Sequence, residues 1–397
     1  MDKKLVVMQG PFNTRSGYGD HARSIFYALY ESDKYEIMIV DVRWGDTPRN
    51  FLRSDNVEHK KLLDCLMKKP LDRQPDIYFD VRIPNEFQTM GKYNIGITAG
   101  IETTAVSQEW IEGCNKMDLV IVPSEHARSG FINTVYDKIN NLPDGSTQKV
   151  GEIRVTTPIE VVFEGVDEDI IKPLQVDQMD KSFIRTINDT VKEKFAFLFV
   201  GQWIKGGFGE DRKDIYKTIK IFSETFANLN NPPALILKTS GATFSILDKV
   251  DIKGKINGMV SFTHGEGFGR PMLEASMVDL PVICSAWSGP VDFLTKEHSI
   301  LVDGKIEQIP QSAVWDNILI KESGWFVIDE HQAFSAFKYA TENVNVIKEK
   351  AKQLGRINRS KFTLVGMSQL LNRIIDERTQ YIAQPVSLNL PKLKKVT

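Results

Sequence analysis

The sequence has few cysteines, no long apolar run and almost no net charge. Its three cysteines, at positions 65, 114 and 284 of 397 residues, show no C-x-x-C or Cys/His spacing, which indicates neither a disulfide framework nor a zinc site. The apolar stretches Leu5–Met8 and Phe195–Val200 are too short for a signal-peptide core or a membrane span. We therefore expect a cytoplasmic protein with reduced thiols and no transmembrane segment.

The charges nearly cancel, with 50 Lys and Arg against 52 Asp and Glu and a formal net charge of −2. This balance argues against a protein held to nucleic acid or to an anionic membrane by net charge alone. Local basic clusters occur at Lys60-Lys61, at Lys68-Lys69 and at Arg356, Arg359 and Lys361. They fit solvated helix faces, and a nucleic-acid groove is the alternative.

Short apolar runs typical of strands alternate with helical patterns in both halves of the chain. They begin at Leu5–Met8 and resume at Phe195–Val200. Strands separated by helices indicate parallel βαβ units, and the length suits two domains. We predict an α/β protein with two Rossmann-like, doubly wound domains: residues 1–173 and, after a boundary near Pro173, residues 174–377. The C-terminal segment 378–397 can pack back on the first domain.

A glycine loop follows the first predicted strand. Gly17-x-Gly19-x-x-Ala22 formally matches the dinucleotide fingerprint, and Asp41 ends the next strand about where its ribose-binding acid would lie. The fingerprint needs its first glycine directly after the strand, however, and eight residues separate Met8 from Gly17. A dinucleotide-dependent oxidoreductase is therefore an alternative only. Gly17 and Gly19 remain candidates for close approach to a phosphate or a sugar.

A second glycine-rich segment, residues 264–275 with the sequence HGEGFGRPMLEA, leads into a predicted helix. Pro271 suits the first helical position, so free N–H groups and the positive end of the helix dipole are available to a phosphate. Glu266 and Glu274 flank that anion site and can accept hydrogen bonds from sugar hydroxyls. Gly267 and Gly269 leave the backbone bare for close approach.

This segment resembles the E-x7-E signature of retaining GT-B glycosyltransferases, particularly family 4. The resemblance extends over most of the chain, and the family implies two Rossmann-like domains that face a cleft. It implies a nucleotide-sugar donor as substrate, with no cofactor and no metal. The supporting stretches are Ser16–Gly19, Phe163–Asp167 with Pro173, Val200–Gln202, Arg212–Asp214 and Leu280–Ser285 with Gly289.

The resemblance also implies roles for individual residues. Glu266 would contact the donor sugar and Glu274 the nucleotide ribose. The diphosphate would be neutralised by Arg212 and Lys213. Backbone amides of the segment from Phe268 to Met272 would assist, and Arg270 would lie near the diphosphate. Because the leaving diphosphate gains negative charge, fixed cations stabilise it better than water does.

Some positions depart from the family pattern. The arginine expected after the first glycine of the second domain is Gln202, an insert runs from Trp203 to Glu210, and part of the nucleobase-binding region between Lys238 and Glu266 is missing. The first-domain histidine that the family often has near the donor sugar is not found after Asn94–Thr98. Instead, Gly100-Ile101-Glu102 resembles a GT-B subset with a glutamate there. Glu102 is predicted to be a catalytic or acceptor-side acid; a helix-start residue is the alternative.

The predicted function is therefore transfer of a hexose or pentose, with retention, from a nucleotide sugar to an acceptor. The acceptor stays open between a glycan, a lipid-linked or lipopolysaccharide sugar and a hydroxymethylated DNA base of the kind that phage enzymes modify. Besides the oxidoreductase, a noncatalytic sugar-nucleotide-binding protein remains an alternative.

Overall fold

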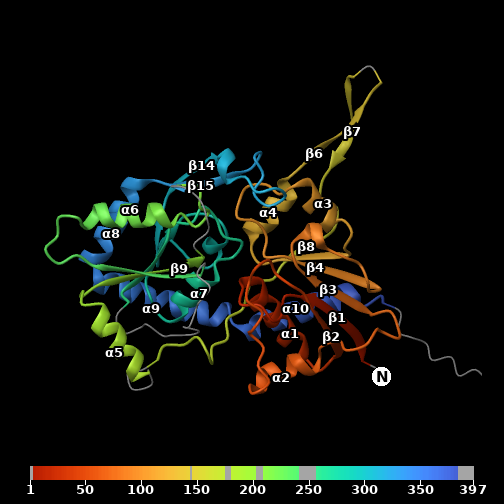
Figure 1. Cartoon of the computed structure of the whole chain (residues 1–397), viewed down its shortest axis with the longest axis horizontal. Coiled ribbons are helices and arrows are strands. Elements are labelled where there is room, and N and C mark those ends of the chain that lie inside the picture. The colour runs from red at the N-terminus through yellow and green to blue at the C-terminus, as the bar shows by residue number, and fades with distance from the viewer. Residues whose placement is uncertain (1–2, 144, 175–179, 203–208, 241–255, 383–397) are drawn as a thin grey trace, which may run out of the picture.

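The computed structural model describes residues 3–143, 145–174, 180–202, 209–240 and 256–382. Within them the chain folds as two α/β halves that contact each other (Figure 1). Most of the predicted insert after Gln202, the centre of the shortened region between Lys238 and Glu266, and the tail beyond Ile382 lie outside the described residues.

The first half contains a parallel sheet of six strands in the order β2-β1-β3-β4-β5-β8. Its strands are β1 (Lys4–Gly10), β2 (Tyr35–Asp41), β3 (Ile77–Val81), β4 (Tyr93–Ile97), β5 (Leu119–Val122) and β8 (Ile159–Val161). Its helices are α1 (Gly17–Tyr30), α2 (Val57–Asp64), α3 (Gln108–Cys114) and α4 (Glu125–Asn133). The sequence had not predicted β3, α2, α3 or α4.

The local sequence explains these elements. From Leu5 to Gly10, β1 is buried at every position, as expected for a central parallel strand covered on both faces. The helices begin at polar caps: the hydroxyls of Ser16 and Ser124 and the amide oxygen of Asn56 each accept a backbone N–H from the first helical turn.

The second half contains a parallel sheet of five strands in the order β10-β9-β11-β12-β13. Its strands are β9 (Ala196–Gln202), β10 (Ala234–Ser240), β11 (Gly258–Ser261), β12 (Val282–Ser285) and β13 (Ile300–Val302). Its helices are α5 (Lys181–Thr190), α6 (Ile215–Phe226), α7 (Arg270–Met277), α8 (Glu330–Glu342) and α9 (Val344–Lys361). The predicted α/β class with two doubly wound sheets is confirmed.

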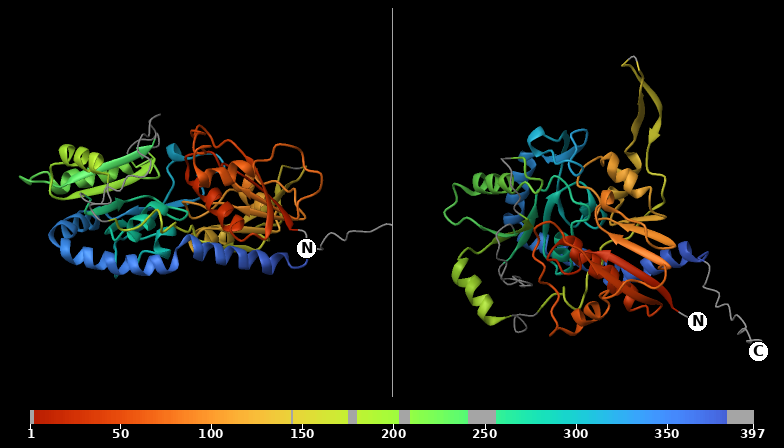
Figure 2. Two further views of the ribbon diagram at one scale, coloured as in Figure 1. Left: turned by 90° about the horizontal axis from the view of Figure 1, so that it is seen from below. Right: turned by 45° about the vertical axis from the view of Figure 1, so that its right-hand side comes forward.

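Two antiparallel hairpins are added to the sheets. In the second half, β14 (Gly304–Gln308) pairs with β15 (Gly324–Ile328). In the first half, β6 (Tyr136–Asn141) pairs with β7 (Thr147–Ile153) and projects away from the body of the molecule (Figures 1 and 2). The sequence had indicated only a turn cluster at residues 141–146, which proves to be the tip of this hairpin.

The chain crosses between the halves twice, and the crossings lie side by side. The N–H of Val166 donates to the carbonyl of Phe362, and the N–H of Leu364 donates to the carbonyl of Val166. A Cβ at Gly165 would overlap the backbone of residues 363 and 364, so only glycine permits this close approach. The two crossings therefore form one hydrogen-bonded connection between the halves.

The last helix, α10 (Leu364–Thr379), packs on the first half. Met367, Leu371, Ile374 and Ile375 join the core beneath β1 and α1, and Figure 2 shows α9 below one half and α10 below the other. The sequence division assigned residues up to 377 to the second domain, whereas the chain returns to the first at Thr363. The apolar spacing of this helix fits either core, so the sequence alone does not choose between them.

Each sheet has a point where the strand order reverses, between β1 and β3 in the first and between β9 and β11 in the second. Ligands of open α/β sheets bind beyond the carboxyl ends of the strands at such points. The loops that follow β1, β4, β9 and β11 are therefore the expected positions of a site.

Candidate active site at the junction of the two halves

The loop before α6 carries the two predicted cations and is fixed to the loop after β11. The carbonyl of Arg212 accepts hydrogen bonds from the N–H of His264, at 2.9 Å, and from Oγ1 of Thr263, at 3.0 Å. Oδ1 of buried Asp211 accepts the N–H of Lys213 at 3.1 Å. Asp214, at φ +47°, turns the chain into α6. These contacts hold Arg212 and Lys213 next to the glycine-rich segment.

His264 supports this arrangement. Its Nδ1 lies 2.7 Å from the carbonyl oxygen of Phe326, its ring stacks on Trp325 with centroids 4.1 Å apart, and its Nε2 lies 3.5 Å from Oδ2 of Asp214. Burial lowers its pKa, although the nearby Asp214 carboxylate opposes that shift. Buried His264 thus holds the loop after β11 against β15.

Four predicted residues from both halves form a charge cluster. Nζ of Lys213 lies 2.6 Å from Oε1 of Glu266 and 3.5 Å from Oε1 of Glu102, and Arg212 forms an ion pair with the other oxygen of Glu102. The side chains of Lys213 and Glu266 are 12% and 15% exposed. Glu102 comes from the loop after β4 of the first half, so the structure brings a first-half carboxylate onto both second-half cations.

The environment of the cluster perturbs its cations. Burial lowers the pKa of Lys213, and the neighbouring Glu266 carboxylate opposes that shift. Burial likewise lowers the pKa of Arg212. Nε of Arg212 is buried and has no hydrogen-bond partner among the described residues. Since buried donors are usually satisfied, this orphaned N–H is available to a further acceptor.

The glycines after β11 allow the two halves to meet. A Cβ at Gly265 would overlap the carbonyl of Glu102, and a Cβ at Gly267 would overlap the carbonyl of Ala99. Oγ of Ser124, the cap of α4, donates to the carbonyl of Gly267 at 2.5 Å. The sequence had assigned the bare backbone of Gly267 to the approach of a ligand. In the structure the first half itself approaches Gly267.

The segment then enters α7 as predicted. Gly269 lies at φ +95°, a conformation that favours glycine, and Pro271 occupies the first turn. Phe268 is buried against Phe293, at a centroid distance of 5.2 Å, so its backbone faces the site and its side chain does not. The sequence had placed Phe268, Gly269 and Arg270 at the donor diphosphate.

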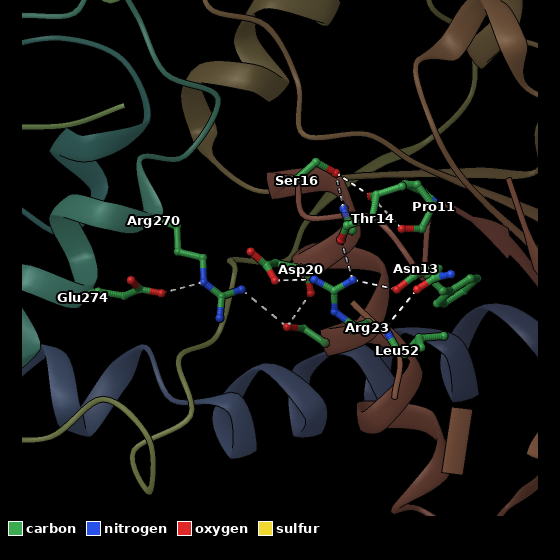
Figure 3. A network of polar contacts seen from close by, with 12 residues as sticks. Pro11, Asn13, Thr14, Ser16, Asp20, Arg23, Leu52, Arg270 and Glu274 are labelled. Atoms are coloured by element: carbon green, nitrogen blue, oxygen red, sulfur yellow. Dashed lines mark hydrogen bonds and ion pairs between the residues drawn. The ribbon is translucent and has the colours of Figure 1, made fainter. Parts of the chain in front are cut away.

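Arg270 connects Glu274 to the first half, as Figure 3 shows. Its Nε donates to Oε1 of Glu274 at 2.9 Å, and its Nη1 lies 3.5 Å from Oγ of Ser24 on α1. On α1, Asp20 pairs with Arg23. The predicted ribose-binding carboxylate is thus oriented by the arginine one helical turn before it.

Two further ionisable side chains, those of Glu164 and His21, surround Arg270. Glu164, in the first crossing between the halves, is buried, and burial raises its pKa to about 7 in spite of the Arg270 cation. His21, on α1, is 1% exposed, and burial together with Arg270 lowers its pKa to about 3. Both ring nitrogens of His21 lack a hydrogen-bond partner within the described part of the chain. In the sequence, only the resemblance of Phe163–Asp167 to the family pointed to Glu164.

The first glycine loop lies against the same junction. Oη of Tyr18 contacts Oγ1 of Thr98 at 2.8 Å and accepts the N–H of Ala99 at 3.2 Å. A Cβ at Gly19 would overlap Thr14, whereas a Cβ at Gly17 would meet nothing within 4 Å. Gly19 is therefore required by packing, and Gly17 leaves open space beside the helix start.

The predicted site residues thus form neighbouring groups around one junction: the ionic cluster, the start of α7 with Glu274, and the glycine loop of α1. Sequence patterns did not indicate Ser124, Asp211 or Ser288, whose hydroxyl accepts the N–H of Glu266 at 3.0 Å. The contacts of Ser124 and Ser288 join separate segments of the chain, which leaves no local signal, whereas Asp211 bonds within its own loop.

Other predicted features lie elsewhere. Arg359 is bound to Asp279 at 2.8 Å, and Lys61 is bound to Glu31 and Glu58. Two of the basic clusters are therefore engaged in part within the fold. In the described ranges no group of His, Cys, Asp and Glu is arranged to hold a metal ion. Those ranges also contain no helix long and apolar enough to cross a membrane.

No protein-family model and no curated protein sequence matches this chain. Solved structures do match over almost its whole length. Sucrose-phosphate synthase from Thermosynechococcus elongatus is 12% identical with a TM-score of 0.58, covering 94% of this chain and 99% of that one. The fold is GT-B.

Two further structures agree with the GT-B assignment. HepE from Anabaena, solved in complex with UDP and glucose, is 12% identical with a TM-score of 0.55 and covers 94% of this chain and 100% of that one. The α,α-trehalose 6-phosphate synthase of Burkholderia multivorans is 11% identical with a TM-score of 0.55 and covers 96% and 100%. The chain thus spans the whole length of both GT-B proteins.

Proposed function

We propose that this chain is a retaining glycosyltransferase that moves a hexose or pentose from a nucleotide sugar to an acceptor hydroxyl. The observation that carries the proposal is the ionic cluster at the junction, in which Lys213 joins Glu266 of one half to Glu102 of the other. The GT-B fold supports it, as does the presence of UDP and glucose in the HepE structure.

The donor diphosphate would bind between the cluster and α7. Arg212 and Lys213 supply positive charge, and Arg212 retains an unpartnered buried N–H. The positive end of α7 adds its dipole and its free amides. Because these groups are fixed before the reaction, they stabilise the charge that develops on the leaving diphosphate without reorganisation. No cofactor or metal is needed in this arrangement.

The carboxylates would then divide the remaining tasks. Glu266, held by Lys213 and by the Ser288 hydroxyl at its own N–H, would accept hydroxyls of the donor sugar. Glu274, oriented by Arg270, would accept the ribose hydroxyls. Glu102 would lie on the acceptor side, where it can receive or share a proton. In the absence of donor it neutralises the cations that the diphosphate would use.

Retention is proposed from the resemblance of residues 266–274 to the E-x7-E pattern. In the family with that pattern, retention is ascribed to front-face attack, in which a phosphate oxygen of the leaving group takes the acceptor proton. The acceptor is proposed as a hydroxyl compound, either a sugar or a hydroxymethylated base. The oxidoreductase alternative is disfavoured by the fold and by the distance between β1 and Gly17.

The test is a donor-hydrolysis screen with UDP-, GDP- and ADP-linked sugars on the purified chain. We expect one donor to be hydrolysed, and NMR of the released sugar should show that its anomeric configuration is retained. Lys213→Ala and Glu266→Gln should each reduce hydrolysis at least about 100-fold. Lys296→Ala and Glu297→Gln, at two exposed residues outside the site, serve as matched controls. If no donor is hydrolysed, a noncatalytic binding protein is favoured. If NAD(P) raises the melting temperature and nucleoside diphosphates do not, the oxidoreductase is favoured.

A further inference from the structure

Asp214 follows Lys213 directly and enters α6 in an unusual conformation. Its backbone lies in the left-handed region, at φ +47° and ψ +45°, which is uncommon for residues other than glycine. An aspartate before a helix ordinarily accepts a backbone N–H of the first turn, but the side chain of Asp214 makes no such bond. Strained backbone of this kind costs free energy and is found most often at functional sites.

The carboxylate of Asp214 is buried among charged groups that the proposed reaction does not use. Its Oδ2 lies 3.0 Å from Nζ of Lys217 on α6 and 3.5 Å from Nε2 of His264 in the loop after β11. The side chain of Lys217 is only 8% exposed. Oδ1 of Asp214 has no hydrogen-bond partner in the described part of the chain. A buried ion pair is not in itself stabilising, and a buried oxygen without a partner costs free energy, so stability does not account for this carboxylate.

The backbone of Asp214 is fixed as well. Its N–H donates to the carbonyl of Asp211 at 2.7 Å. Its carbonyl accepts the N–H and the hydroxyl of Thr218, both at 3.0 Å. Together with the contacts of the carboxylate, these bonds tie residue 214 to the loop before it, to α6 and to the loop after β11.

The same bonds determine where the side chain of Lys213 begins. On one side of Lys213, the carbonyl of Arg212 accepts the N–H of His264, and the N–H of Lys213 itself donates to Oδ1 of Asp211. On the other side, the N–H of Asp214 is held by the carbonyl of Asp211. Both peptide groups that flank Lys213 are therefore anchored.

We propose that Asp214 positions Lys213 for catalysis. The left-handed turn at Asp214 sets the direction of the chain, and the buried carboxylate fastens that turn to Lys217 and His264. The ammonium of Lys213 is thereby kept beside Glu266, at 2.6 Å. A cation that is fixed before the reaction stabilises developing charge better than one that must reorganise. This role of Asp214 rests on the proposed function, in which Lys213 stabilises the leaving diphosphate.

The first test measures the affinity for nucleoside diphosphates by calorimetric titration with UDP, GDP and ADP. The free nucleoside diphosphate carries the charge that the donor develops only during transfer, so its affinity reports on Lys213. Asp214→Ala should weaken the affinity at least about tenfold. Asp214→Asn should weaken it less, because asparagine tolerates the left-handed conformation.

Asp279→Ala is the matched control. Asp279 also has a left-handed backbone, at φ +60°, and is paired with Arg359 at 2.8 Å. It follows the end of α7 that lies away from the site. Its substitution should lower the melting temperature and leave the affinity unchanged, which separates lost stability from lost positioning.

The second test measures donor hydrolysis in two backgrounds. Asp214→Ala should lower kcat about 100-fold and change the KM for donor less than about twofold. In a Lys213→Ala background the same substitution should cause no further loss, because the group that Asp214 positions is absent. A residue with only a structural role would act equally in both backgrounds. Circular dichroism at the assay temperature shows which variants are folded, and if Asp214→Ala is not, Asp214→Asn takes its place with an expected loss of about tenfold.

The outcomes separate this inference from the proposed function. Unchanged affinity and kcat in the Asp214 variants, or an additive loss in the Lys213→Ala background, would overturn the role of Asp214 and leave the proposed function standing. A wild-type chain that binds a nucleoside diphosphate but hydrolyses no donor would refute the proposed function, and the affinities would still decide the role of Asp214. A wild-type chain that binds none of the three nucleotides would overturn both.

Discussion

The ammonium of Lys213 lies between two carboxylates from different halves of the protein, 2.6 Å from Glu266 and 3.5 Å from Glu102. All three side chains are largely buried, so each partner compensates the desolvation of the others. One cation thereby links the donor side of the junction to the acceptor side.

This link predicts thermodynamic coupling between the halves. Lys213→Met should lower the free energy of unfolding by about 1–3 kcal/mol, because two partly buried carboxylates lose a hydrogen-bond donor. In a Glu102→Gln background the same substitution should cost less, since one of those carboxylates is already neutral. Urea unfolding of the four proteins measures the coupling. Strictly additive effects would show that Lys213 and Glu102 do not interact.

Glu102 is expected to act in transfer and not in nucleotide binding. Glu102→Gln should reduce transfer to an acceptor by about 10²–10⁴-fold, the usual contribution of a positioned proton acceptor. The affinity for UDP, or for whichever nucleoside diphosphate the screen selects, should stay the same or rise, because the substitution removes a negative charge from Arg212 and Lys213. Calorimetric titration checks the affinity. A parallel loss of nucleotide binding and transfer would contradict an acceptor-side role.

Two glycine substitutions distinguish packing from ligand contact. Gly267→Ala places a methyl group into the backbone carbonyl of Ala99 in the other half, so the junction should open. We expect a larger radius of gyration in small-angle scattering and a loss of most activity. Gly17→Ala has open space and should leave the melting temperature unchanged. A reduced affinity for donor in Gly17→Ala would then identify direct contact with the ligand, and an unchanged radius in Gly267→Ala would refute the close junction.

Glu164 should make stability depend on pH. Burial raises its pKa in the folded protein to about 7, above the value of about 4.3 in an unfolded chain. The folded state therefore binds the proton more tightly, and this stabilisation is complete below about pH 4 and is lost as the pH rises to 7. Glu164→Gln should remove that loss, so its melting temperature should exceed that of the wild type more at pH 8 than at pH 5. An equal difference at both pH values would contradict the raised pKa.

Arg270 should influence donor affinity through Glu274. Arg270→Met removes the guanidinium that holds Oε1 of Glu274 at 2.9 Å, so the KM for donor should rise about tenfold, corresponding to one charged hydrogen bond, with a smaller change in kcat. Ser24→Ala removes only the 3.5 Å contact to the first half and should have little effect on KM. The same Arg270→Met change should raise the pKa of His21, which Arg270 lowers, as NMR titration of the imidazole would show.

The sequence predicted most of the inner strands, because strands such as β1 are continuous apolar runs bounded by turn residues. It missed β3 and the hairpin β6–β7. The hairpin carries mixed polar and aliphatic residues exposed on both sides, so no alternation of hydrophobicity indicates it. The sequence division placed α10 in the second domain, because a helix with an apolar stripe fits either core.

The sequence by itself determined the α/β class and the segments that would supply charge and bare backbone, because hydrophobic period, glycine and proline act over a few residues. Only the tertiary structure decided that Glu102 meets Arg212 and Lys213, that the carbonyl of Ala99 fills the space beside Gly267, and that α10 returns to the first half. Those contacts join residues more than a hundred positions apart. They depend on how two separately folded sheets pack, which no local pattern encodes.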